Sequence, residues 1–180
     1  MDEPGNFFSP TKAIRFGWTV EAKARPRTWP YTCGIKDMDA SHVLVRRGEV
    51  PAAEVEQFIR AVEDELSRAG KSRQGPPMVV MRGAEGKGEA EPPVRVEVLL
   101  PVPAGTSPPA GFEAASLPPQ SVAYTVHHGR PDGLKGAERV LADWVKMKSL
   151  HFAEEVRRIY IKRGKNPRKD VTEVQIPLQR

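Results

Sequence analysis

Two glutamates occupy similar positions in two segments that alternate between apolar and polar residues. Glu97 lies in Val-Arg-Val-Glu-Val-Leu-Leu-Pro-Val (94–102), and Glu173 lies in Val-Thr-Glu-Val-Gln-Ile-Pro-Leu (171–178). Each glutamate stands near the start of its segment and is followed by a proline, Pro101 or Pro177. A similarity between segments this far apart predicts an internal repeat of two supersecondary units. Carboxylates facing a groove can neutralise an organic cation or hold a water molecule as a general base.

The alternation also predicts the face of the sheet on which these residues lie. Neighbouring side chains of a strand point to opposite faces, so the apolar neighbours of Glu97 and Glu173 face a core and the glutamates face away from it. The same reasoning places Tyr160 and His127 on the face of the glutamates. Each of the four residues also has a simpler interpretation, as a solvated strand residue or a residue at the rim of the sheet.

Residues 1–37 match neither half of the repeat and contain Trp18 and Trp29. Prolines forbid a continuous helix around Trp29, so we expect an extension that packs on or over the domain through its aromatic side chains. Aromatic rings around a carboxylate suit a hydrophobic, cationic or planar ligand. The candidate ligand-binding residues are therefore Glu173, Tyr160, Glu97, His127, Trp18 and Trp29.

Hydrophobic periodicity predicts the same order of elements in both halves of the domain at 38–180. The first half (38–103) has strands at 42–48, 78–82 and 94–102, and a helix at 51–70. The second half (111–178) has strands at 111–116, 121–128, 158–163 and 171–178, and a helix at 134–150. Gly48 and Gly129 close the first long strand of each half, and we call their separation along the chain the glycine offset. The predicted fold class is α+β: duplicated strand–helix–strand–strand units in an antiparallel sheet, with both helices on one face and a ligand groove on the other.

The composition of the chain excludes several kinds of site and indicates where the protein is located. The 180 residues carry a net charge of +5 and one cysteine, which excludes an intramolecular disulfide and a multi-cysteine metal site. His127 and His128 point to opposite faces and cannot chelate together, so no metal or cofactor is expected. The sequence has no apolar run that could cross a membrane and no signal peptide, so we expect a cytoplasmic protein.

Basic residues are densest at 162–169, Lys-Arg-Gly-Lys-Asn-Pro-Arg-Lys, between two predicted strands. We interpret this segment as a solvated hairpin loop, with a phosphate contact as the alternative. No nucleic-acid-binding motif is present, so direct binding of nucleic acid is not expected.

The order of several short motifs resembles the gyrase-inhibitor-like (GyrI-like) small-molecule-binding domain, which is also the effector-binding domain of bacterial transcription activators. The motifs are Leu-Pro-Pro-Gln-Ser-Val-Ala-Tyr (117–124), His-His-Gly (127–129), Ala-Asp-Trp (142–144), Arg-Ile-Tyr (158–160) and Thr-Glu-Val-Gln-Ile-Pro-Leu (172–178). The resemblance runs from about residue 38 to the C-terminus. It implies a ligand groove between the halves, with Glu173 neutralising a hydrophobic cation and Tyr160 as the aromatic residue of the preceding strand.

The leading hypothesis is a stand-alone module that captures hydrophobic, cationic or planar small molecules, for sequestration or sensing. A second hypothesis is a hydrolase of reactive electrophilic natural products, with Glu173 as the general base. A third is a protein-interaction module that binds DNA gyrase or a regulator protein. Nothing in the sequence demands an enzyme.

Overall fold

The computed structural model describes residues 31–83 and 93–179. Trp18, Trp29 and most of the extension predicted for 1–37 lie outside these residues. The chain divides into two units, Met1–Thr32 and Cys33–Arg180, and the second unit contains every element described below. Its elements are β2 (Cys33–Met38), β3 (Ser41–Val50), η4 (Ala52–Glu54), α2 (Val55–Arg68), β4 (Met78–Gly83), β5 (Val94–Pro101), β6 (Glu113–Leu117), β7 (Gln120–His128), η5 (Pro131–Gly133), α3 (Leu134–Met147), β8 (Arg157–Lys162), η6 (Pro167–Lys169) and β9 (Val171–Pro177).

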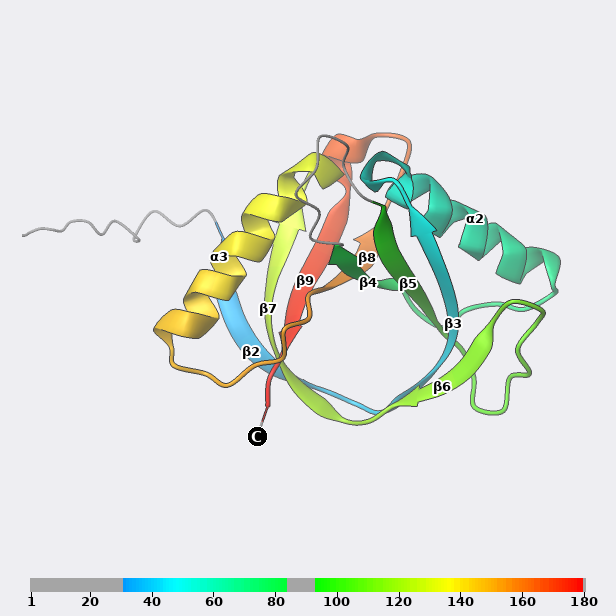
Figure 1. Ribbon diagram of the computed structural model, residues 1–180, viewed down its shortest axis with the longest axis horizontal. Coiled ribbons are helices and arrows are strands. Elements are labelled where there is room, and N and C mark those ends of the chain that lie inside the picture. Colours follow the sequence, from blue (N-terminus) through cyan, green and yellow to red (C-terminus); the bar gives the residue numbers. More distant parts are fainter. Residues whose placement is uncertain (1–30, 84–92, 180) are drawn as a thin grey trace, which may run out of the picture. The chain divides into compact units, whose positions relative to one another are not determined.

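The strands form a single eight-stranded antiparallel sheet in the order β2-β7-β9-β8-β4-β5-β3-β6. The sheet is curled, and each half of the duplication contributes one helix (Figure 1). The predicted α+β class and the duplicated strand–helix–strand–strand order are confirmed. The first half comprises β3, α2, β4 and β5, and the second half comprises β7, α3, β8 and β9.

Two additional strands cross between the halves. Strand β2 directly precedes β3 in sequence but pairs with β7, and β6 directly precedes β7 but pairs with β3. The sheet therefore begins at Cys33, within the segment interpreted as an extension. Strand β2 was not predicted from the sequence.

A pseudo-twofold axis passes through the centre of the sheet. Met78 of β4 and Ile159 of β8 are related by the glycine offset, and they pair directly with each other. Strands β2 and β6 follow the same symmetry, because Ser41 pairs with Leu117 and the residues related to them by this offset, Val122 and Lys36, also pair. The glycine offset therefore relates the two halves in space.

The closing strands follow a different offset from the one that the sequence indicates. Met78 pairs with Leu99, and its counterpart Ile159 pairs with Glu173. The position equivalent to Glu173 is therefore Leu99 and not Glu97. The prediction that the two glutamates occupy matching positions was wrong by two residues. A shift of two keeps the side chains on the same face of a strand, which is why the alternation did not reveal it.

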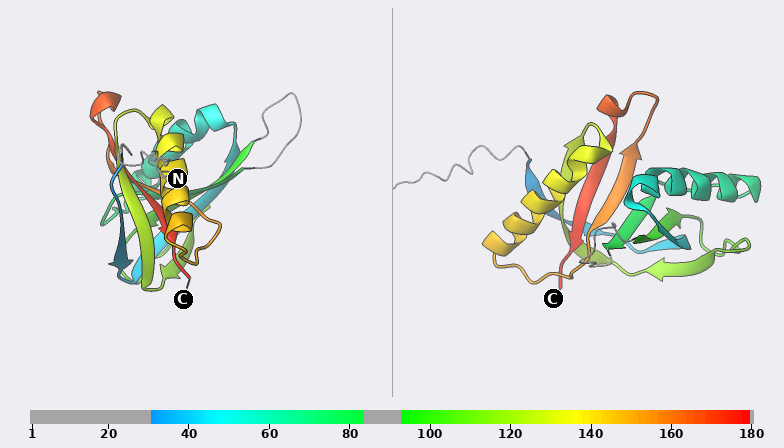
Figure 2. Two further views of the ribbon diagram at one scale, coloured as in Figure 1. Left: turned by 90° about the vertical axis from the view of Figure 1, so that its left-hand side faces the viewer. Right: turned by 45° about the horizontal axis from the view of Figure 1, so that its top comes forward.

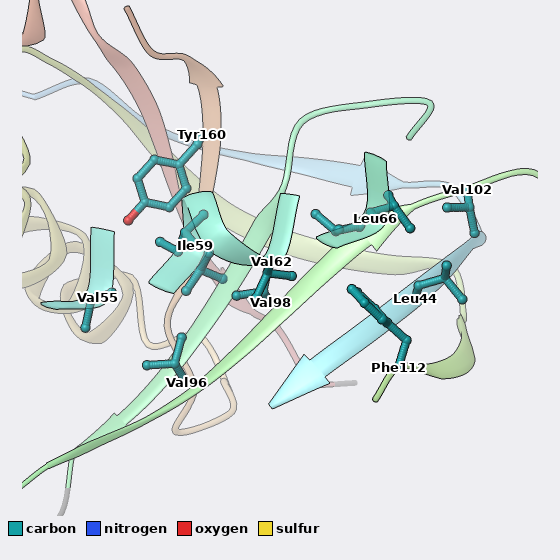
Figure 3. Packing of buried hydrophobic residues seen from close by; sticks show 12 residues of the cluster. Leu44, Val55, Ile59, Val62, Leu66, Val96, Val98, Val102, Phe112 and Tyr160 are labelled. Atoms are coloured by element: carbon teal, nitrogen blue, oxygen red, sulfur yellow. The ribbon is translucent and has the colours of Figure 1, made fainter. Parts of the chain in front are cut away.

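Both helices pack on one face of the sheet, which we call the helix-bearing face. Each helix buries one apolar stripe with helical spacing, Val55, Ile59, Val62 and Leu66 in α2 and Leu134, Ala137, Leu141 and Val145 in α3. Helix α2 covers a cluster that includes Leu44, Val96 and Val98 (Figure 3). Figure 2 (right) shows α3 and α2 on either side of β9 and β8. No helix within the described residues is long and apolar enough to span a membrane.

Candidate ligand-binding site

Tyr160 lies on the helix-bearing face, beneath α2, and not on the face of Glu173. In an antiparallel ladder, directly paired residues share a face. Tyr160 pairs with Thr172, whereas Glu173 pairs with Ile159. Tyr160 is only 3% exposed and belongs to the core cluster under α2. The predicted face was wrong because Ile159 is buried on the helix-free face, and Ile161, which lies at a register shift, is exposed. Apolar side chains therefore do not distinguish the two faces of this strand.

His127 also lies on the helix-bearing face, contrary to the prediction, because it pairs with Thr172. Its Nε2 donates a hydrogen bond to the carbonyl oxygen of Arg130, at 2.9 Å. A Cβ atom at Gly133 would lie 2.6 Å from the imidazole Cε1, so the ring packs tightly against the start of α3. In this position His127 fixes the connection between β7 and α3.

Glu173 lies on the helix-free face, as predicted, but its charge already has a partner. The ammonium group of Lys36 lies 2.8 and 2.7 Å from its two carboxylate oxygens, and Gln175 Nε2 donates a hydrogen bond to Oε1 at 2.7 Å. The same ammonium group lies 4.7 Å from the centre of the Tyr124 ring. Glu173 is 7% exposed, whereas the Lys36 side chain is 36% exposed, so the carboxylate is buried and its ammonium partner reaches solvent. A cationic ligand at Glu173 would compete with Lys36, which contacts both carboxylate oxygens.

Glu97 shares the helix-free face with Glu173, but strands β8 and β4 lie between their strands. Arg47 donates a hydrogen bond to Glu97 at 2.7 Å, and Arg82 lies 4.0 Å away. The Glu97 and Glu113 carboxylates raise the pKa of Arg47. The structure therefore does not bring Glu97 and Glu173 together; each has its own basic partner.

A groove of about 1180 Å³ lies on the helix-bearing face, between the first turns of α2 and the length of α3. The sequence predicted a groove on the opposite face. Both halves contribute to its lining, as the resemblance implied. The apolar lining consists of Ala52, Ala53, Val55, Met81, Val94, Pro131, Ala142, Phe152, Ala153, Val156 and Ile176. Its charged lining has five carboxylates (Glu56, Asp132, Glu138, Glu154, Glu155) and four basic side chains (Arg82, Lys135, Lys146, Arg158), so the groove is slightly acidic.

The polar groups at the base of the groove are not all satisfied. Arg158 donates a hydrogen bond to Glu138 and so links β8 to α3. Glu56 Oε1 and Tyr160 Oη are shielded from solvent and have no hydrogen-bond partner within the described residues. Burial and then the negative charge of Glu56 raise the pKa of Tyr160, while Arg158 opposes the shift. Figure 3 shows the Tyr160 hydroxyl directed out of the cluster, on the side of Val55, which precedes Glu56. The groove thus ends at a shielded oxygen of Glu56 that lies beside the Tyr160 hydroxyl but forms no well-aligned hydrogen bond within the described residues.

Comparison with known families identifies the class of protein. The model of the GyrI-like small-molecule-binding domain matches residues 32–179, most of the chain. The chain therefore belongs to the GyrI-like family. The match begins beside β2, in agreement with the place of that strand in the sheet. No match was found among curated proteins.

Solved structures show the same fold at low sequence identity. In the EcmrR–DNA complex, the EcmrR chain is 20% identical with a TM-score of 0.74; the match covers 86% of this chain and 59% of EcmrR. The chain thus spans somewhat more than half of that protein. The EcmrR C-terminal domain alone is 20% identical with a TM-score of 0.71, with 83% and 98% of the two chains covered. SAV2435 bound to tetraphenylphosphonium is 10% identical with a TM-score of 0.54, with 82% and 94% covered.

Proposed function

We propose that the domain captures an amphipathic organic cation in the groove between α2 and α3, with Glu56 as the acidic contact. The observation that carries this proposal is the position of Glu56: it lines a groove with extensive apolar walls, and its buried Oε1 lacks a hydrogen-bond donor among the described residues. A buried acceptor without a partner costs free energy that a ligand donor or cation would recover.

The shape of the groove supports a ligand with bulky apolar groups. Small side chains such as Ala52, Ala53 and Ala142 leave the space open, and Met81 and Phe152 supply adaptable apolar contacts. SAV2435, which shares the fold, is bound to tetraphenylphosphonium, a large lipophilic cation. A ligand of that kind matches both the volume and the slight excess of acid in this groove.

Glu173 remains the competing candidate for the acidic contact. The requirement that Lys36 leave its carboxylate makes this site costlier to occupy than the groove. The two sites lie on opposite faces of the sheet, so single substitutions can separate them. The structure adds Glu56 and Arg158 to the residues that the sequence indicated, and it retains Tyr160 as their neighbour. We propose no ligand contact for Glu97 or His127, because each already has a protein partner.

Titration of tetraphenylphosphonium against three proteins tests the proposal: the wild type, Glu56→Gln and the matched control Glu173→Gln. We expect Glu56→Gln to weaken binding about 10- to 100-fold, the contribution of a hydrogen-bonded or ionic contact to a charged group. Triphenylphosphine oxide, which is bulky but neutral, should bind all three proteins alike. Ala142→Trp should block both ligands by filling the groove.

Two results would contradict this assignment. Loss of cation binding in Glu173→Gln with full binding in Glu56→Gln would move the site to the helix-free face. Unchanged binding in Ala142→Trp would exclude the groove altogether. Isothermal titration calorimetry measures the affinities, and urea denaturation of each variant confirms that it is folded.

A further inference from the structure

We propose that a second pocket, separate from the groove, binds the phosphate group of a small anionic ligand. This pocket of about 800 Å³ lies between the middle of α2, the segment that leads into β4, and the end of β8. The two sets of lining residues do not overlap, although Tyr160, which lines the pocket, lies next to Glu56 of the groove. It is the place where the dense basic segment noted in the sequence, 162–169, meets the body of the domain.

The pocket carries a net positive charge. Arg60, Arg73, Lys162 and Arg163 line it, against the carboxylates of Glu63 and Asp64. Glu63 is shared: Arg73 Nη2 lies 3.1 Å from Oε1, and Arg163 Nη2 contacts Oε2. One carboxylate between two guanidinium groups leaves a positive charge that the protein does not neutralise.

Two further cations have no partner. Arg60 and Lys162 form no hydrogen bond or ion pair with any of the residues that the structure describes, and both side chains are exposed. Neither is needed to hold the fold, so both are available to a ligand. Phosphate, with its two negative charges and several acceptor oxygens, is the group that such a cluster recognises.

Arg163 forms the preorganised part of the site. Its side chain is only 11% exposed, and its guanidinium group lies 5.1 Å from the centre of the Tyr160 ring. Tyr160 and Glu63 together fix the plane of the guanidinium group, whereas Nη1 is buried and has no acceptor within the described part of the chain. A shielded guanidinium nitrogen without an acceptor, beside a pocket with an excess of cations, favours an anionic ligand over a cationic one.

A compact phosphate fits this geometry better than nucleic acid does. The other basic residues of the hairpin, Lys165, Arg168 and Lys169, do not line the pocket. The cations that do line it converge on one hollow from α2, β8 and the segment before β4, instead of following an extended stripe. Convergence on one point suits a terminal phosphate group, such as that of a phosphate monoester.

The experiment titrates inorganic phosphate and glycerol 3-phosphate into the full chain at constant ionic strength, with chloride as the control anion. The pocket variant is Arg60→Gln/Lys162→Gln, and the matched control is Lys165→Gln/Arg168→Gln, which removes the same charge from the hairpin outside the pocket. We expect saturable binding that weakens about tenfold or more in the pocket variant, the effect of losing a charged hydrogen bond. The control should change by less than about twofold.

Three results would overturn the proposal. These are equal weakening in both double variants, the absence of saturable binding to the wild type, and tight binding of duplex DNA that both variants lose alike. The first and third would show a general attraction of anions to the basic hairpin. Tetraphenylphosphonium binding is measured in the same variants and should not change, so failure of this site and failure of the groove are distinguishable.

Discussion

The helix-free faces of the two halves have the same strand arrangement, but equivalent positions carry apolar side chains in one half and charged side chains in the other. In the first half, Leu99 and Leu117 pack in an apolar cluster with Val43, Val45 and Val80. The register of the sheet makes Glu173 the counterpart of Leu99 and Lys36 the counterpart of Leu117. An apolar contact between two strands in one half is therefore replaced by an ion pair in the other. Both leucines of the first half are replaced by charged residues in the second half.

This difference shows that Glu173 and Lys36 form one unit. A largely buried carboxylate without its ammonium partner would cost several kcal/mol, so neither charge fits this position alone. The first half shows that the same backbone accepts two leucines. The ion pair is therefore not required by the architecture, and its effect on stability can be measured against a control within the same molecule.

The largest effect should follow from breaking the ion pair on one side. Lys36→Leu leaves the Glu173 carboxylate buried, with Gln175 as its hydrogen-bond donor among the described residues. Because Glu173 is buried but Lys36 is partly exposed, we expect the free energy of unfolding to fall by about 2–4 kcal/mol, between the values for an exposed and a fully buried pair, as measured by urea denaturation. A loss below about 1 kcal/mol, typical of an exposed pair, would mean that water reaches Glu173 readily.

Replacing both members should restore most of the stability. Lys36→Leu/Glu173→Leu converts the second half to the residues of the first half, and we expect unfolding free energy within about 1 kcal/mol of the wild type, or above it. The double-mutant cycle with both single variants then gives the coupling energy of the pair. Additive losses in the double variant would show that the two side chains act independently.

The contact between strand and helix also differs between the halves. In the first half, the ring of Phe58 in α2 covers Gly48 of β3; in the second half, the ring of His127 in β7 covers Gly133, just before α3. Because the hydrogen bond from His127 to Arg130 holds the imidazole in place, Gly133→Ala should cost about 1–3 kcal/mol.

Gly136, which lies within α3, provides the control. Apart from the backbone of α3 itself and the two chain neighbours, none of the described atoms lies within 4 Å of a Cβ at this position, so Gly136→Ala should stabilise the domain by about 0.5–1 kcal/mol. Thermal unfolding of both variants measures the difference. Equal effects at the two glycines would show that the His127 ring moves without cost.

The smallest effect concerns Tyr160, whose counterpart in the first half, by the glycine offset, is Val79. Burial and the Glu56 charge raise the pKa of Tyr160 above that of a free tyrosine, about 10. A raised pKa stabilises the fold below the unfolded value, and this contribution is lost as the pH rises through the folded value. Tyr160→Phe should therefore reduce the loss of stability at alkaline pH, measured by urea denaturation between about pH 9 and 11. If the stability of the wild type and of Tyr160→Phe depended on pH in the same way, the raised pKa of Tyr160 would not contribute to the alkaline loss of stability.

The sequence predicted the duplicated fold because helical and strand periodicities survive in both halves. It missed β2, although the glycine offset, applied to the strand predicted at 111–116, points to the start of this strand. Strand β2 has little apolar alternation, since Gly34, Lys36 and Met38 share one face. Its place in the sheet depends on β7, far along the chain.

The candidate site was predicted less well, for two physical reasons. Both faces of β7 and β8 are buried in places, so apolar residues do not indicate which side the helices cover. Glu56 belongs to the first turn of a helix, where a glutamate is usually solvated, and only its proximity to Tyr160 of β8 distinguishes it. Long-range packing of this kind is not visible in local spacing.

The exchange of β2 and β6 between the halves has a consequence for synthesis of the protein. Cys33 of β2 can pair with Thr125 of β7 only after the second half of the chain has emerged from the ribosome. Until then, β2 remains an unpaired edge, which is a site for aggregation. Neither half can complete its ladder without the other, so a fragment ending in the connector between the halves would lack a finished sheet. This pairing predicts that the sheet is completed only after both halves are synthesised, and that the domain folds slowly for its size, because distant contacts dominate its strand pairs.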